Sequence, residues 1–142
     1  MEIKEIVQTL SGEKGTSCPF KLSKILKIGI LYENIGTMMG YYSKDYRFKF
    51  IHINQNLSKR EQRFVCAHEL GHAILHPDVN TPFLTQHTLF SKSKVERQAN
   101  IFAVELLMPD DLLLEHSEIS LYNIATDLGI PAKLADLKQL KK

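Results

Sequence analysis

Residues 68–72 read His-Glu-Leu-Gly-His, and this His-Glu-x-x-His pattern constrains the chain more than any other stretch. On a helix, residues i and i+4 lie about 5–6 Å apart on one face, so His68 and His72 can offer two imidazole nitrogens to one metal ion. Glu69 is rotated by about 100° from His68, which leaves its carboxylate free to take a proton from a water molecule activated by that ion. The motif therefore predicts two zinc ligands and a general base in one helical segment.

The residues around the motif have the pattern of a helix. Helix formers occupy 59–67, and apolar residues recur at helical spacing as far as Leu75. Ser58, with Glu61 three positions later, matches a capping box that begins a helix, and Pro77 ends it. A shuffled chain of this composition would contain the motif about 0.02 times by chance. We expect a metal-binding helix, although a core helix with two hydrogen-bonded histidines has the same spacing.

A catalytic zinc site needs a third protein ligand, because it keeps one coordination position for water. Our choice is Glu96, on a predicted helix over 94–108 that Pro109 ends. Glu96 borders the apolar stripe of that helix, where a carboxylate needs a partner. Asn100 lies one turn later on the same face and is a candidate to accept the outer N–H of a ligating histidine.

Other assignments compete with this one. Asp78 lies soon after the motif, but Leu75 stands where a glycine would let the chain turn back to the metal. His76 would lie roughly 12 Å along the helix axis from His68 and cannot share its ion. Glu96 would instead be structural if it paired with a nearby cation, for which the candidates are Arg63, Lys94 and Arg97.

The segments before the motif predict two short helices and a small sheet. Helical spacing marks 2–10 and 19–28, and strand patterns mark 30–34, 38–43 and 47–54, with a hairpin turn at 43–46. The predicted fold class is α+β, with a small three-stranded antiparallel sheet packed on the motif helix. The second ligand-bearing helix and a helical C-terminus follow.

A sheet that leads directly into the motif helix is a recurrent layout of small zinc proteases. An edge strand beside the metal can pair with an extended peptide, and 38–43 and 47–54 are both candidates for that strand. Residues 77–91 have no sustained period and are expected to form a rim or lid. The donor to the oxyanion could come from Tyr41, Tyr42 or a loop histidine such as His87.

Composition excludes several classes of protein. A net charge of +2 gives no field that favours nucleic acid, so direct nucleic-acid binding is not expected. Two cysteines make no disulfide framework, and Cys66 points to a different helix face from His68, so we expect it to pack in the core. No apolar run could cross a membrane and no secretion signal is visible, so we expect a cytoplasmic location.

The length of 142 residues suits one domain. We divide it into N-terminal helices (1–28), a catalytic core (29–110) and a helical C-terminal segment (111–142). The basic residues near its end are expected to form a solvated tail: Lys138, Lys141 and Lys142.

Residues 68–76 and 96–109 together resemble the ImmA/IrrE family of metallopeptidases carried by phages, integrative elements and some bacterial genomes. The resemblance covers about residues 19–110 and includes Gly40-Tyr41-Tyr42 and Ile51-His52-Ile53-Asn54. It implies a gluzincin-like zinc protease of the cytosol, which acts as an anti-repressor by cutting a helix-turn-helix repressor encoded beside it. Carried over to this chain, the ligands are His68, His72 and Glu96 and the catalytic residue is Glu69.

Two further functions remain open at this point. A non-proteolytic anti-repressor would bind and sequester a repressor, with zinc as a structural ion. A DNA-binding regulator would use 120–142, where Gly129 separates two stretches with helical character. No base-reading set of Arg, Asn or Gln is visible on the second stretch, which favours packing or substrate recognition for the C-terminal segment.

Overall fold

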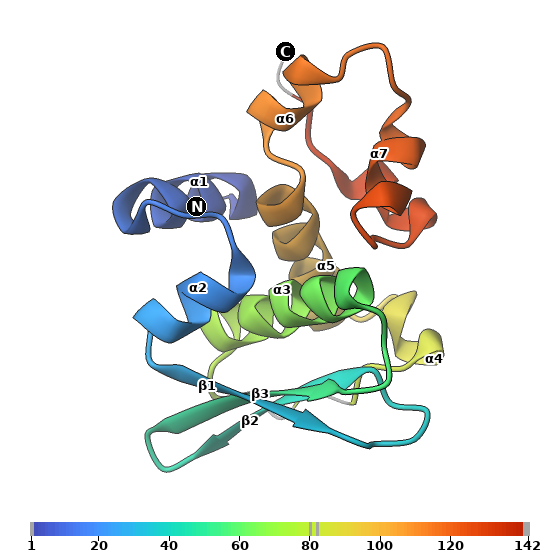
Figure 1. The fold of residues 1–142 in the computed structure, drawn as a ribbon. Coiled ribbons are helices and arrows are strands. Elements are labelled where there is room, and N and C mark those ends of the chain that lie inside the picture. Colours follow the sequence, from blue (N-terminus) through green and yellow to red (C-terminus); the bar gives the residue numbers. More distant parts are fainter. Residues whose placement is uncertain (1, 80, 82, 141–142) are drawn as a thin grey trace.

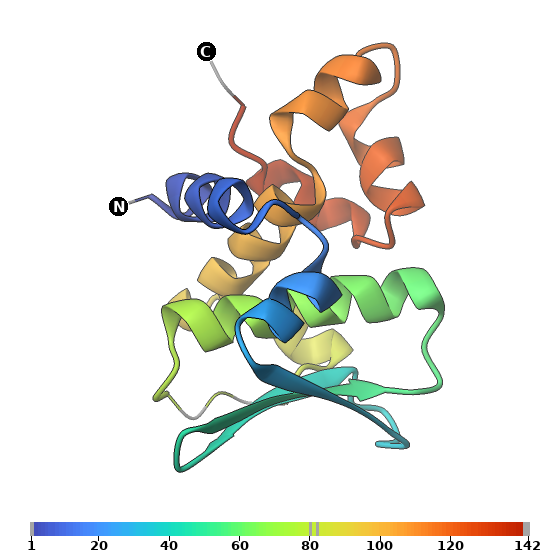
Figure 2. The same cartoon turned by 60° about the vertical axis from the view of Figure 1, so that its left-hand side comes forward.

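The computed structural model describes residues 2–79, 81 and 83–140, and its long helices lie on one side of a small sheet (Figures 1 and 2). The α+β class is therefore confirmed. In chain order the elements are α1 (Ile3–Lys14), α2 (Pro19–Ile25), β1 (Ile28–Glu33), β2 (Gly40–Asp45), β3 (Phe48–Asn54), α3 (Lys59–Leu75), α4 (Gln86–Leu89), α5 (Lys94–Leu107), α6 (Asp110–Glu115), α7 (Leu121–Asp127) and the 3-10 helix η1 (Ala132–Leu137). Among the described residues, no helix combines the length and apolarity needed to span a bilayer.

The sheet is mixed, so the expectation of an antiparallel sheet was wrong. β3 is the central strand, with β2 antiparallel to it on one side and β1 parallel to it on the other. β1 and β2 run in opposite directions, as in a hairpin, but β3 lies between them. The physical reason is burial: Ile51 and Ile53 of β3 are fully buried under α3, and a strand with such a core face is most stable where both of its edges are paired.

Several element boundaries differ from the predicted ones because glycines act differently from what was expected. α1 continues through Gly12 and ends at Gly15, which adopts the left-handed conformation (φ 71°) that favours glycine. The second helix ends at Ile25 instead of 28, and Gly29 lies inside β1, where a Cβ would be 2.7 Å from the Phe50 ring of β3. The hairpin turn falls at residues 46–47, where Tyr46 has a positive φ.

α3 carries the motif and packs along α5. The predicted capping box begins α3: the Ser58 side chain accepts from the Glu61 N–H, and the Glu61 side chain accepts from the Ser58 N–H. Gly71 faces Phe102 of α5, and a Cβ at Gly71 would lie 3.0 Å from the Phe102 Cβ. The absence of a side chain at Gly71 thus allows the close approach of the two helices that carry the candidate ligands.

The C-terminal part folds back onto α5, and one expectation about it was wrong. Lys138 is buried rather than solvated: its Nζ lies 2.6 Å from Glu105 Oε1 and 2.9 Å from Asp110 Oδ1. Lys4 of α1 also pairs with Asp110, at 3.0 Å. A buried ammonium needs such carboxylate partners. One of them, Glu105, comes from α5, and the sequence pattern could not reveal that it pairs with Lys138. The remaining residues of the expected tail, Lys141 and Lys142, lie outside the described residues.

Candidate metal centre

Two crossing helices bring His68, His72 and Glu96 together. His68 and His72 lie one turn apart on α3, and Glu96 lies in the first turn of α5. The Nε2 atom of His68 is 3.1 Å from Glu96 Oε1, and the Nε2 atom of His72 is 3.1 Å from Glu96 Oε2. All three side chains are almost completely buried. This is the set that the sequence predicted from two separate segments.

The geometry of these atoms fits a metal ion better than a network of hydrogen bonds. One potential ligand atom from each residue lies within 4.8 Å of the others. His72 Nε2 and Glu96 Oε2 face each other without hydrogen-bond alignment, and neither has another partner in the described part of the chain. Buried polar atoms without partners are costly, and a cation held between them would satisfy both. Two imidazole nitrogens and a carboxylate oxygen are a donor set typical of zinc and related transition metals.

Burial also sets the protonation of the two carboxylates. Burial raises the pKa of Glu69 to about 8, since the facing His72 only partly offsets it and Glu96 adds to it. For Glu96, burial raises the pKa, but the adjacent imidazoles of His68 and His72 outweigh burial and lower it to about 2. Glu96 is thus ionised, as a metal ligand must be, while Glu69 has the higher proton affinity expected of a general base.

Each candidate ligand histidine has a partner at its outer ring nitrogen. Asn100 Oδ1 lies 2.8 Å from His68 Nδ1, and the Asn100 amide donates to the Leu89 carbonyl oxygen at 2.8 Å. Asn100 therefore lies where its predicted role requires. For His72, the partner is His76, whose Nδ1 is 3.3 Å from His72 Nδ1. Sequence reasoning missed this contact, although the i, i+4 spacing of the two histidines could have indicated it.

The rival ligand Asp78 and the histidine His87 do not join the three candidate ligands. Asp78 is exposed and pairs with Lys44, and His87 is exposed on α4. Within the described residues, Glu96 forms ion pairs with His68 and His72 and with none of the three cations considered above.

The two candidate oxyanion donors lie on opposite faces of the sheet. Tyr41 stacks on His52 with the ring centroids 4.0 Å apart, and its hydroxyl donates to Glu33, so the structure does not bring it to the buried triad. Tyr42 faces the core side, and its hydroxyl donates to the Pro77 carbonyl oxygen at 3.0 Å. The alternation of side chains along β2 causes this separation.

His52 stacks on Tyr41, on the face of the sheet opposite α3. There it forms two hydrogen bonds with neighbouring strands. Its Nδ1 is 2.9 Å from Glu33 Oε1 and its Nε2 is 2.8 Å from Ser43 Oγ. The order of hydroxyl, imidazole and carboxylate is that of a nucleophilic triad, but Ser43 pairs with Phe50 in the β2–β3 ladder, which leaves its own N–H unavailable as an oxyanion donor. These hydrogen bonds link side chains of β1, β2 and β3, and we assign them the structural role of holding the three strands together.

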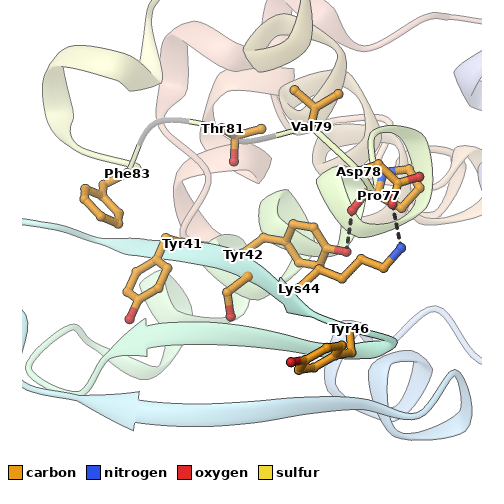
Figure 3. A pocket seen from close by; sticks show the side chains of 10 residues that line it. Tyr41, Tyr42, Lys44, Tyr46, Pro77, Asp78, Val79, Thr81 and Phe83 are labelled. Atoms are coloured by element: carbon orange, nitrogen blue, oxygen red, sulfur yellow. Dashed lines mark hydrogen bonds and ion pairs between the residues drawn. The ribbon is translucent and has the colours of Figure 1, made fainter.

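A pocket of about 560 Å³ lies between β2 and the segment that follows α3 (Figure 3). In Figure 3 the side chains of Tyr42 and Lys44 reach across to Pro77 and Asp78. The predicted rim over 77–91 includes α4 and a bridge from Leu84 to Gly40 at one end of β2, and Asn80 and Pro82 lie outside the described residues.

β2 is an edge strand, whereas the strand at 47–54 is central and cannot serve as an edge. Since ladder bonds alternate, the backbone N–H and C=O groups of Tyr42 and Lys44 point away from β3. No described residue outside the sheet forms a backbone hydrogen bond with these groups, and the neighbouring bridge runs from the Leu84 N–H to the Gly40 carbonyl oxygen. The outward backbone groups of Tyr42 and Lys44 are therefore the candidate edge for pairing with an extended peptide.

Comparisons with known proteins identify relatives of this chain. Residues 24–138 match the Peptidase M78 model, which is described as the IrrE N-terminal-like domain. The chain is 47% identical over 143 residues to the uncharacterized immunity region protein 2 of Bacillus phage phi105, with 99% of this chain and 90% of the relative covered. It is 36% identical over 142 residues to the metallopeptidase ImmA of Bacillus subtilis strain 168, with 96% and 83% covered. Over 118 residues it is 31% identical to the phage-like element PBSX protein XkdA of the same strain, with 80% and 56% covered.

Proposed function

This chain belongs to the IrrE N-terminal-like family, Peptidase M78, and on that premise we propose that it is a zinc-dependent endopeptidase of a phage or mobile element. Its proposed substrate is a helix-turn-helix repressor, whose cleavage in the cytoplasm would relieve repression of the element's genes. The observation that carries the proposal is the buried convergence of His68, His72 and Glu96 beside Glu69. The names of two relatives, a metallopeptidase and a phage immunity region protein, support it.

In the proposed mechanism, His68, His72 and Glu96 hold the ion and Glu69 moves the proton. Bound zinc would supply a Lewis acid that acidifies water and polarises the scissile carbonyl. Glu69 accepts the proton of the attacking water and delivers it to the leaving amine nitrogen. The low exposure of all four side chains strengthens their electrostatic interactions with the reacting atoms.

The substrate would bind as an added strand along β2. The outward backbone groups of Tyr42 and Lys44 would pair with an extended peptide, and the adjoining pocket would accept a side chain of it. Tyr42 is the candidate donor to the oxyanion, because it lies on the same side of the sheet as α3. We further propose that 1–142 act as one domain in which the segment 111–142 contributes to recognition of the repressor.

The test is incubation of the purified chain, loaded with zinc, with the helix-turn-helix repressor encoded next to its gene. Two fragments of the repressor, identified by mass spectrometry, would support the endopeptidase. An intact repressor in a stable complex would contradict it and support the sequestering anti-repressor instead. The Glu69→Gln protein serves as the control, since fragments that form equally fast with it come from a contaminating protease.

A further inference from the structure

The outer nitrogens of both candidate ligand histidines lead into short chains of hydrogen bonds that end on α5 or beside it. The chain from His68 runs through Asn100 to the Leu89 carbonyl oxygen. The chain from His72 runs through His76, whose Nε2 lies 2.6 Å from Gln98 Oε1. α5 thus supplies a ligand at Glu96 and an outer partner for each histidine, at Gln98 and Asn100.

The direction of the second chain follows from an inventory of protons. A neutral imidazole has one N–H and one lone pair, and an amide oxygen only accepts. Because Gln98 presents Oε1, His76 must carry its proton on Nε2 and donate it there. The Nδ1 atom of His76 then has a lone pair, which can accept only from an N–H on His72 Nδ1. This leaves the lone pair of His72 on Nε2, the atom that faces Glu96.

We propose that His76 and Gln98 are positioning residues that fix the tautomer and ring orientation of His72 for binding zinc. The inference rests on the metal centre of the proposed function and deepens it. A hydrogen-bond acceptor behind a ligating histidine, here the Nδ1 atom of His76, raises the basicity of the ligand and holds its ring in place, and loss of such a partner typically weakens metal binding by about 10–100-fold. His76 would hold the His72 ring through its Nδ1 atom, without contacting the atoms that converge on Glu96.

The experiment measures the affinity of the full chain for zinc alone, by competition with a chromophoric chelator. His76→Ala should weaken zinc binding by about 10–100-fold. His76→Asn should restore most of the affinity, because its Oδ1 can accept the bond from His72 Nδ1. At the other position, Gln98→Ala should weaken binding and Gln98→Glu should retain it. The matched control is His116→Ala, which removes a histidine at the end of α6.

Circular dichroism establishes that each variant is folded, and the Gln98 pair decides the question if His76→Ala is not. The inference is overturned if the alanine variants bind zinc as tightly as the wild type, or if the Asn and Glu variants are as weak as the alanine ones. In those cases tight binding by the wild-type chain leaves the proposed function standing. A wild-type chain that binds no zinc would overturn both.

Discussion

At the scale of single residues, His72 and Glu69 lie three positions apart and should have separable roles. We expect His72→Ala to lose zinc to a competing chelator, because two ligands remain of three. Glu69→Gln should keep about one zinc per chain but lower the rate of repressor cleavage by about 10²–10⁴-fold. Metal analysis of the two variants, together with a cleavage assay, checks both statements. Full zinc content in the His72 variant would contradict its assignment as a ligand.

Cys66 lies two residues before the candidate ligand His68, and its environment makes it inert. Burial raises the pKa of the Cys66 thiol to about 12, and the Ser23 hydroxyl at 3.9 Å only partly offsets this. Since the thiolate is the reactive form, iodoacetamide at pH 8 should modify the half-buried Cys18 and leave Cys66 unmodified until the chain unfolds. Peptide mass spectrometry with and without urea gives the answer, and Cys18→Ser identifies the peptides. Modification of Cys66 in the folded protein at the rate of Cys18 would show that iodoacetamide reaches Cys66 and would contradict this prediction.

At the scale of elements, the two ligand-bearing helices begin with the same sequence pattern but not with the same cap. Ser58-x-x-Glu61 forms a capping box at α3. Ser93-x-x-Glu96 has the same spacing, yet the Ser93 side chain makes no cap bond and Glu96 turns to the two histidines. Local propensity would use Glu96 at the helix end, and the tertiary contact with α3 overrides it.

The difference between the two caps can be measured. Ser58→Ala should lower the free energy of unfolding by about 1 kcal/mol, because it removes the bond to the Glu61 N–H. Ser93→Ala is the matched control and should cost only a few tenths of a kcal/mol. Urea denaturation of both variants provides the comparison. Equal losses of unfolding free energy in the two variants would mean that the capping box of α3 adds no stability beyond that of a serine without a cap bond.

Gly12 in α1 and Gly129 in the turn after α7 should respond oppositely to a methyl group. At Gly12, inside α1, a Cβ would meet nothing within 4 Å, so Gly12→Ala should stabilise the protein by about 0.5–1 kcal/mol. At Gly129 the φ of 79° and the Arg60 carbonyl oxygen, which would lie 2.5 Å from an added Cβ, both oppose a side chain. Gly129→Ala should therefore cost at least about 1 kcal/mol. Thermal unfolding of both variants tests the pair, and a stable Gly129 variant would show that the turn after α7 can move away from α3.

At the scale of the whole molecule, a partly buried ionic cluster joins the N-terminal and C-terminal segments to α5 and α6. Lys4 comes from α1, Asp110 begins α6, and Lys138 follows η1 and pairs with Glu105. Figure 2 shows α1 near the segment that follows η1, and the Lys4 Nζ donates to the Gln139 carbonyl oxygen at 2.7 Å. The cluster holds the C-terminal segment against the helices that carry the metal site, so its loss should affect stability globally.

The cluster also makes stability depend on pH. Burial of Asp110 raises its pKa, but the hydrogen bonds and charges of Lys138 and Lys4 outweigh it and lower the pKa below the ordinary 3.8. A lowered folded pKa gives stability that is complete above the unfolded value and is lost as the pH falls through the folded one. Asp110→Asn should therefore cost about 1–3 kcal/mol at pH 7, and the difference from wild type should shrink below about pH 4.

Asp111 provides the control for this prediction. It lies in the same first turn of α6, where it has the same helix-dipole environment, but it is exposed. Asp111→Asn should leave the urea midpoint nearly unchanged at every pH. A constant difference between Asp110→Asn and wild type from pH 7 to pH 3 would contradict the role of the ionic pairs.

The amino-acid sequence by itself determined the local features of this protein. The spacing of His68 and His72 and the capping box at Ser58 depend on neighbours within four residues, and the structure has both in place. Helix periodicity likewise located α5, and the burial of Glu96 on it was indicated by the apolar stripe. Such features are readable because the backbone geometry of one helix fixes them.

Tertiary structure alone decided the features that depend on contacts between distant segments. It placed β3 between β1 and β2, joined His76 to Gln98, and buried Lys138 against Glu105. The partners in the last two contacts are 22 and 33 residues apart, and a local pattern carries no information about a partner at such a separation. The residues of the metal site were readable from the chain, whereas the contacts that orient them required the fold, because burial and pairing between distant segments decide them.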